Sequence, residues 1–228
     1  HNGEINTIRG NQNWMTCHED RMDSEVFGDA IEDLKPVIGK GSSDSAALDA
    51  VFELMGHGGR TLPMLKTMMI PAAVDVDGDG ELAKLYAYCN AVMEPWDGPA
   101  AIAAYANNWV IAGLDRNGLR PMRYVVTDDG LVIAGSETGM VVVPEERIIE
   151  RGRIGPGQMM GIDLKRGAMF SNDELKAELA GKRDWAKWIG RSQQMDTLLA
   201  KNGAKPSERL PALDVRRRQM MAGWTMED

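Results

Sequence analysis

The chain has 228 residues, of which 43% are hydrophobic and 26% are charged, as is ordinary for a globular protein with a sizeable core. Its formal net charge of −8 excludes a general basic surface for nucleic acid. Two cysteines, Cys17 and Cys89, make no disulfide framework, and no apolar run approaches the roughly 20 residues that cross a bilayer. We therefore expect a cytoplasmic protein that binds neither nucleic acid nor membrane.

Both ends of the sequence predict a fragment of a longer protein. The chain begins with His1 and stops inside a stretch typical of a helix, "LDVRRRQMMAGWTMED". The basic run Arg216 to Arg218 in this stretch is expected to form a solvated helix face.

Residues 1–20 are polar and rich in turn formers, and they open with "HNGEIN". Asn2 and Gly3 both tolerate positive φ, so the simplest interpretation is a hairpin turn. The functional alternative is that the Asn side-chain amide and the Gly N–H present two donors to one oxygen. Residues 21–41 mix acidic and apolar positions and end in the breaker Gly39-Lys40-Gly41.

Three helices are predicted next. The first runs from a cap among Ser42, Ser43 and Asp44 to the glycines of 56–59. The second spans 61–70 and ends before Pro71, and the third follows a polar loop at 74–80 and ends near Pro95. The apolar residues of the first and third recur at helical spacing: Leu48, Val51, Phe52 and Met55; Leu82, Leu85, Tyr86, Cys89, Val92 and Met93.

Residues 100–170 are predicted to form antiparallel strands. Turn signals separate most of the short apolar segments "AAIAAYA", "WVIAGL", "MRYVVT" and "LVIAGS", a pattern typical of a meander. Further strands, "RIIERGRI" and "QMMGIDL", surround Gly155-Pro156-Gly157. Because the apolar runs do not alternate strictly, we expect strands that are covered on both faces. From Ser171 the chain is polar and helical.

The acidic stretch "DVDGDG" matches the start of a calcium-binding EF-hand loop at Asp75, Asp77, Asp79 and Gly80. Position 12 of such a loop should be Glu, and it is Tyr86. We expect a solvated acidic loop that binds no calcium. The sequence also has no Cys/His cluster with zinc spacing and no phosphate-binding glycine motif, so no metal or cofactor site is expected in these residues.

Five segments occur in a specific order: "HNGEINTIRGN" at 1–11, "SSDSAALD" at 42–49, "MEPWDGPAAIA" at 93–103, "LDRNGLRP" at 114–121 and "VIAGSETG" at 132–139. Together they resemble the class II glutamine amidotransferase family. The first and third segments favour its glutamate synthase branch over amidophosphoribosyltransferase and asparagine synthetase. Each motif alone is weak, whereas five in order are specific.

The resemblance implies an α+β fold, the four-layer α/β/β/α sandwich of N-terminal-nucleophile hydrolases with antiparallel sheets. Residues 1–170 would be the partial glutaminase core, and 171–228 a helical exit segment to the next domain. In the family, an N-terminal Cys thiol attacks the side-chain amide of L-glutamine with its own α-amino group as base. Ammonia leaves, the thioester is hydrolysed to glutamate, and downstream synthase domains combine the ammonia with 2-oxoglutarate.

For the full-length protein the resemblance implies an oxidoreductase of glutamate biosynthesis and nitrogen assimilation. FMN and an iron–sulfur cluster would be its cofactors, NADPH or ferredoxin its electron source, and a small reductase subunit a partner. None of these cofactors is expected within residues 1–228. Two other functions stay open: another class II amidotransferase, or a non-catalytic amino-acid-binding module on the same fold.

The chain departs from the family at the nucleophile, because its first residue is His1 and not Cys. Cys17 and Cys89 have no attached α-amine to serve as base. Cys89 is expected on a buried helix face, and Cys17 is not expected to pair with the adjacent His18. We therefore predict that the 228-residue chain alone has no glutaminase activity.

Carried over residue by residue, the resemblance implies that Asn2 and Gly3 form an oxyanion hole, whose donors stabilise the charge that develops on the amide oxygen. It also implies that the Asp44 carboxylate binds the α-ammonium of glutamine, with Ser43 contributing a hydroxyl. The structural alternative for Asp44 and Ser43 is that they cap a helix.

The turn that holds Asp115, Arg116, Asn117 and Arg120 is either an active-site loop or a structural clamp between strands. We favour the clamp, because opposite charges at this spacing can satisfy one another. Glu137 in "GSETG" could face the pocket, but it is assigned no role.

Overall fold

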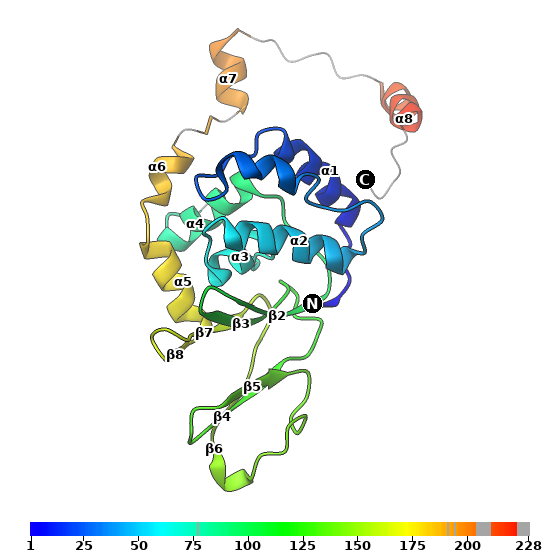
Figure 1. The fold of residues 1–228 in the computed structure, drawn as a ribbon. Coiled ribbons are helices and arrows are strands. Elements are labelled where there is room, and N and C mark those ends of the chain that lie inside the picture. The colour runs from blue at the N-terminus through cyan, green and yellow to red at the C-terminus, as the bar shows by residue number, and fades with distance from the viewer. Residues whose placement is uncertain (77, 191, 194, 204–210, 223–228) are drawn as a thin grey trace. The chain divides into compact units, whose positions relative to one another are not determined.

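The structure, a computed structural model, describes residues 1–76, 78–190, 192–193, 195–203 and 211–222. The chain divides into two compact units, His1–Ile189 and Gly190–Asp228. The first unit is built of helices and two antiparallel sheets (Figure 1), which confirms the expected α+β class. The predicted domain boundary at residue 170 falls inside this unit, because Leu175, Leu179 and Trp185 pack into its core.

The described helices and strands follow one another in chain order. The helices are α1 (Ile8–Glu19), α2 (Asp44–His57), α3 (Leu62–Met69), α4 (Glu81–Val92), α5 (Asn172–Gly181), α6 (Trp185–Ile189), α7 (Met195–Lys201) and α8 (Ala212–Met221), with 3₁₀ turns at Gly28–Leu34 and Glu145–Arg147. The strands are β1 (Asn2–Gly3), β2 (Ala100–Ala106), β3 (Trp109–Leu114), β4 (Arg123–Thr127), β5 (Val132–Gly135), β6 (Ile148–Arg153), β7 (Met159–Asp163) and β8 (Ala168–Phe170).

The three predicted helices are confirmed as α2, α3 and α4. Ser43 is the N-cap of α2, and its side chain accepts a hydrogen bond from the Ala46 N–H at 3.2 Å. The expectation of turns throughout residues 1–20 is wrong, because α1 occupies Ile8–Glu19. Only Asn11 and Met15 of α1 are buried, so the helix leaves almost no apolar periodicity in the sequence.

The strands are antiparallel as expected, but the prediction of one meander is wrong. Strands β2 and β3 form a hairpin in a five-stranded sheet of order β1-β2-β3-β7-β8. The chain then leaves that sheet, and β4 becomes the centre of a three-stranded sheet of order β5-β4-β6. The turn at 115–121 therefore connects two sheets and not two neighbouring strands.

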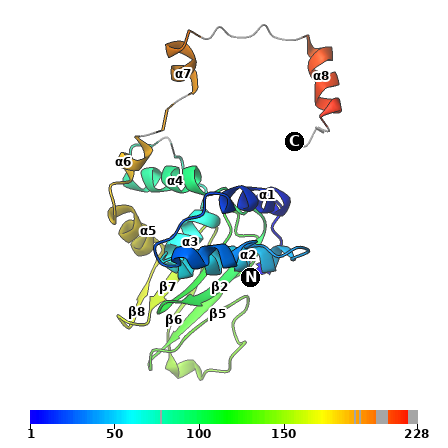
Figure 2. The same ribbon diagram turned by 45° about the horizontal axis from the view of Figure 1, so that its top comes forward.

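Helices of the first unit cover one face of the five-stranded sheet (Figure 2). Ile111 and Met159 of this face pack with the helices in the main core. Ala112, Leu114 and Met160 point the other way and form a second cluster, against which Tyr124 and Val132 of the three-stranded sheet pack. Strands β3 and β7 are thus covered on both faces as expected. Strand β2 is not, since its Tyr105 is 69% exposed.

Helix α3 is the most deeply buried helix, and all of its residues are buried. They include Lys66, which is 1% exposed and donates from Nζ to the Gly157 carbonyl at 3.1 Å. Burial lowers the pKa of this lysine to about 7, because a charged ammonium loses its hydration there.

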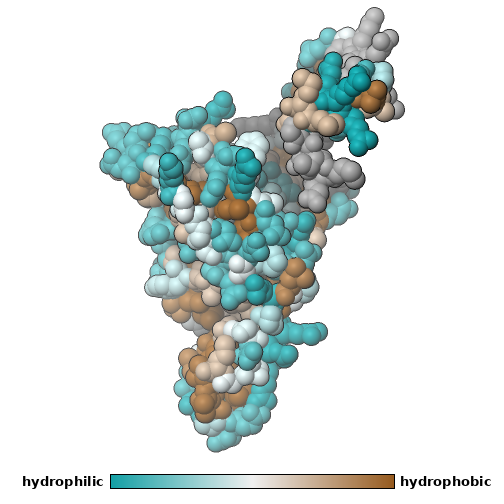
Figure 3. Space-filling view, turned by 90° about the vertical axis from the view of Figure 1, so that its right-hand side faces the viewer, coloured by the Kyte–Doolittle hydropathy of each residue, from teal (hydrophilic) through white to brown (hydrophobic). Residues whose placement is uncertain are grey.

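Apolar side chains gather on the surface of the three-stranded sheet, which forms the lower part of the molecule in Figure 3. Exposed residues of the sheet and its loops include Leu131, Met140, Val141, Val142 and Ile149. In the described part of the chain, no helix is long and apolar enough to cross a membrane.

The second unit contains α7 and α8. Arg216 to Arg218 are exposed on α8, as predicted for a solvated face. The Pro-containing stretch 204–210 and the last six residues, 223–228, lie outside the described residues.

Candidate active site

The hairpin-turn interpretation of Asn2 and Gly3 is wrong, because these residues form β1 at the edge of the five-stranded sheet. Asn2 lies opposite Ala101 and Gly3 opposite Ala100 in an antiparallel pair. The side chain of Asn2 is exposed, and Gly3 is half-buried. The two candidate donor residues are thus held on a strand, where the sheet fixes the direction of the backbone.

Two glycines let the backbone of β1 cross the 97–100 segment at very short range. Gly3 has φ +152°, and a Cβ at this position would lie 1.7 Å from the Pro99 carbonyl oxygen. Gly98 has φ +147°, and its Cβ would lie 2.0 Å from the Glu4 carbonyl oxygen. No side chain fits at either contact, so this crossing requires glycine.

Backbone hydrogen bonds continue this pairing past β1. The Glu4 N–H donates to the Pro99 carbonyl at 2.9 Å, and the Asn6 N–H donates to the Asp97 carbonyl at 2.7 Å.

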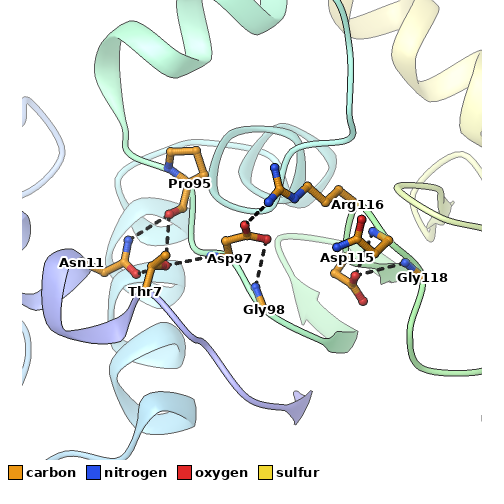
Figure 4. Close-up of polar contacts among 9 residues, drawn as sticks. Thr7, Asn11, Pro95, Asp97, Gly98, Asp115, Arg116 and Gly118 are labelled. Atoms are coloured by element: carbon orange, nitrogen blue, oxygen red, sulfur yellow. Dashed lines mark hydrogen bonds and ion pairs between the residues drawn. The ribbon is translucent and has the colours of Figure 1, made fainter. Parts of the chain in front are cut away.

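Side chains of the first turn of α1 complete the attachment (Figure 4). The Thr7 hydroxyl accepts from the Asp97 N–H at 3.0 Å and donates to the Asn11 side chain at 2.7 Å. Asn11 in turn donates to the Pro95 carbonyl at 3.1 Å. The first and third motifs of the sequence are therefore one interlocked structure.

Asp115 and Arg116 hold the other side of the same loop (Figure 4). The buried Asp115 carboxylate accepts from the backbone N–H groups of Ala100, Asn117 and Gly118 at 3.0, 2.9 and 3.1 Å. The Arg116 guanidinium contacts the Asp97 carboxylate at 2.5 Å. The turn does clamp two segments together, but the reason we expected is wrong: Arg116 pairs with Asp97, and Asp115 accepts only from N–H groups.

Asp44 ties the N-terminus of α2 to the segment that follows β1. Its Oδ2 accepts from the Ile5 N–H at 2.9 Å, and its Oδ1 accepts from the Ser45 N–H at 2.7 Å. The bond from Ile5 is the main cause that holds the pKa of this carboxyl below its usual value of 3.8. Asp44 is the first residue of α2 and Ser43 is the cap, so the capping alternative describes Ser43.

Four of the five motifs therefore meet around β1. The fifth, at 132–139, contributes β5 to the three-stranded sheet, and its Glu137 is exposed. The arrangement presents an exposed Asn2 on a rigid edge strand. The Asp44 carboxylate lies nearby, because it is hydrogen-bonded to Ile5, two residues beyond Gly3. Such an edge suits stabilisation of a developing negative charge beside a site for a cation.

Comparisons with known proteins decide the family. The family model described as "Glutamine amidotransferases class-II" matches residues 1–188. The chain belongs to the class II glutamine amidotransferase family. Over its whole length it is 52% identical to "Glutamate synthase [NADPH] large chain" of Azospirillum brasilense and covers 15% of that protein.

Other relatives of this amidotransferase chain carry similar names. It is 41% identical to "Glutamate synthase [NADH]" of Saccharomyces cerevisiae over 88% of the chain and 9% of the relative. It is 42% identical to "Ferredoxin-dependent glutamate synthase" of Pyropia yezoensis over 86% of the chain and 13% of the relative. The chain thus spans less than a sixth of the length of these relatives.

Neither cysteine of this amidotransferase chain is placed to act as a nucleophile. Cys89 is buried as expected, and burial raises the pKa of its thiol to about 12. Cys17 is exposed on α1. The adjacent His18 contacts the Glu94 carboxylate at 3.1 Å, and the described residues show no hydrogen bond between His18 and Cys17.

The expectation that residues 75–80 form a solvated acidic loop without calcium stays untested, because Asp77 lies outside the described residues. Tyr86, which stands where the last ligand should be, is buried in α4. Among the described residues, no group of three or more His, Cys, Asp or Glu side chains is arranged to hold a metal ion.

Sequence reasoning missed the residues that anchor the site. Thr7, Asn11 and Asp97 lie inside recognised motifs, but nothing in their local pattern indicates that they contact one another across about 90 positions. The one available signal was the "DG" of "PWDG", since glycine marks a close backbone approach. The buried Lys66 was also missed, because a single lysine in an apolar helix normally marks its exposed face.

Proposed function

We propose that this chain is part of the glutaminase domain of a glutamate synthase, which hydrolyses L-glutamine to glutamate and ammonia. One observation carries the proposal: the Asn2–Gly3 strand is fixed by glycine crossings and hydrogen bonds, and Asp44 is bonded to the same segment at Ile5. An oxyanion hole requires donors that are already oriented before the reaction, and the pairing of β1 with β2 supports this role because it fixes the backbone of both residues.

In this proposal Asn2 and Gly3 donate to the amide oxygen of glutamine as a thiol attacks its carbon. The nucleophile that the family implies, an N-terminal Cys, is not among residues 1–228. The carbon–nitrogen bond then breaks, ammonia leaves with a proton from the α-ammonium of that Cys, and water hydrolyses the thioester. The residues of this chain orient the substrate and stabilise its charge.

Asp44 is proposed to receive the α-ammonium of glutamine. Its two oxygens each accept one backbone hydrogen bond, and a carboxylate has about four acceptor positions, so capacity remains for a ligand. The Ser43 hydroxyl accepts from Ala46 and keeps its own proton to donate to substrate. Asp44 would thus select free glutamine over an amide in a peptide.

The four-layer fold is likewise a proposal. Helices, the five-stranded sheet and the three-stranded sheet supply three layers in order. The exposed apolar side chains of the three-stranded sheet (Figure 3) are where a further helix layer would pack, because apolar surface of this kind usually contacts another part of a protein.

For the longer protein we propose that ammonia passes to synthase domains of the same polypeptide, which hold FMN and an iron–sulfur cluster. Residues 1–228 have too few cysteines to ligate such a cluster. The relatives are named for NADPH, NADH and ferredoxin, so the electron source and a small reductase subunit stay open. A cytoplasmic location is proposed from the two free cysteines.

The test uses the full-length protein with L-glutamine labelled with ¹⁵N in the amide group. With 2-oxoglutarate and reductant, the label should appear in the α-amino group of newly formed glutamate. N-acetyl-L-glutamine, which lacks the α-ammonium, should be a poor substrate, and Asp44→Asn should raise the KM for glutamine about 10–100-fold with little change in kcat. Binding of glutamine without release of label would favour the non-catalytic amino-acid-binding module.

A further inference from the structure

A pocket of about 270 Å³ is lined by none of the residues that anchor β1. Two helical junctions and one helix build it: the α2–α3 turn with Arg60 and Thr61, the α5–α6 junction with Lys182, Arg183 and Trp185, and α4 with Tyr88. We propose that this pocket binds a small molecule that carries a phosphate group.

The charge of the pocket is opposite to that of the chain. Arg60, Lys182 and Arg183 line it, and none of its lining residues is acidic. Four other cavities in the described part of the chain are each lined by at least one carboxylate, namely Asp23, Asp97, Asp163 and Glu137 respectively. On a chain with a net charge of −8, this is a localised positive site, which attracts anions and raises their local concentration.

The three cationic groups are available to a ligand. All three side chains are exposed, and within the part of the chain that the structure describes none forms an ion pair. Asp184, next to Arg183, uses its carboxylate to accept from the Lys187 N–H at 3.2 Å. Two guanidinium groups and one ammonium match the oxygens of a phosphate, which guanidinium binds with paired N–H donors.

The backbone adds to this preference for an anion. Helix α3 begins at the pocket, with Thr61 as its N-cap, and the Thr61 side chain makes no capping hydrogen bond to the first turn. Pro63 in this turn has no N–H, but the uncapped N–H groups of its neighbours and the positive end of the helix dipole favour a negatively charged group at this position.

An apolar wall lies beside the charged groups. The rings of Tyr88 and Trp185 pack with their centroids 4.7 Å apart, and the buried side chains of Met64 and Leu179 line the same pocket. A pocket of this volume holds a small molecule and is too small for a folded partner. Charge and wall together therefore fit a phosphate ester with a compact apolar or planar part.

The test is arginine-specific modification of the full-length protein by phenylglyoxal, with each site followed by peptide mass spectrometry. Pyrophosphate, inorganic phosphate and AMP are the probes, at constant ionic strength set by chloride. We expect at least one probe to slow modification of Arg60 and Arg183 saturably, by about tenfold when the site is full. Arg153, an exposed arginine on β6, is the internal control and should react at an unchanged rate.

Two lysine variants test whether the protection depends on the charge of the pocket. Lys182→Gln should weaken the protection of Arg60 and Arg183, whereas Lys165→Gln, at an exposed lysine that does not line the pocket, should leave it unchanged. Equal protection of Arg153, protection that never saturates, or no protection of Arg60 and Arg183 by any of the three probes would each overturn the proposal. The readout does not depend on glutaminase activity, so it stands or falls separately from the proposed function.

Discussion

At the scale of single residues, the Asp44 carboxylate contributes to stability through its contact with Ile5. Its bond from the Ile5 N–H stabilises the ionised form and holds its pKa below 3.8. Because the pKa in the folded state is below that of the unfolded chain, this contribution to stability is present above about pH 4 and is lost as the pH falls through the folded pKa.

Asp44→Asn should therefore lower the free energy of unfolding by an amount that depends on pH. The difference from wild type should be constant from pH 5 to 7 and should shrink below pH 4, where the wild-type carboxyl becomes protonated. Urea unfolding at a series of pH values measures it. A difference that stays the same at pH 3 would show that the carboxylate charge does not contribute to the Ile5 contact.

Lys66 gives the opposite pH dependence. Its pKa is lowered to about 7 from 10.5, so between these values the unfolded chain binds a proton that the folded protein does not. The contribution of Lys66 to the free energy of unfolding therefore rises with pH over that range. The Lys66→Met variant should lose this dependence.

Relative to Lys66→Met, wild type should gain up to about 1.4 kcal/mol of unfolding free energy for each pH unit between pH 7 and pH 10. Denaturant titrations of both proteins at pH 7, 8, 9 and 10 measure the gain. Parallel stability curves would mean that Lys66 keeps its charge in the folded protein.

At the scale of elements, the contact between β1 and the 97–100 segment depends on the absence of a Cβ. Gly98→Ala should reduce the free energy of unfolding by about 3 kcal/mol or more, because the new Cβ would overlap the Glu4 carbonyl. Gly10→Ala is the matched control, because Gly10 lies in α1 with no atom within 4 Å of its Cβ position. This control should gain about 0.5–1 kcal/mol. Similar effects of both substitutions would mean that the crossing is looser than described.

The elements also show what a sequence can and cannot predict. Helices α2, α3 and α4 are predictable. The apolar residues of α2 and α4 repeat with the helical period, and α3 is a short apolar segment that ends before Pro71. Helix α1 is not predictable, since it is attached by Thr7 and Asn11 through hydrogen bonds to Pro95 and Asp97, which leave no periodic signal. For Asn2 and Gly3 the motif indicated a function, whereas only the pairing with β2 shows that they form a strand.

At the scale of the whole molecule, long-range contacts decide the arrangement. The strand segments were predictable, but their division into two sheets was not, because each apolar segment is compatible with either sheet. The packing of Ala112 and Leu114 against Tyr124 and Val132 depends on how the chain turns after β3. That turn is set by the Asp115 carboxylate and its backbone N–H partners.

The central claim is that Asn2 serves the hydrolysis of glutamine and no other step. Steady-state kinetics of Asn2→Ala in the full-length protein, with glutamine and then with ammonia as nitrogen donor, test it most directly. With glutamine, kcat should fall about 10²–10³-fold with little change in KM, because the lost donor acts in the transition state. With ammonia, which bypasses this site, glutamate formation should be unchanged. Equal losses with both donors, or no loss with glutamine, would contradict the account.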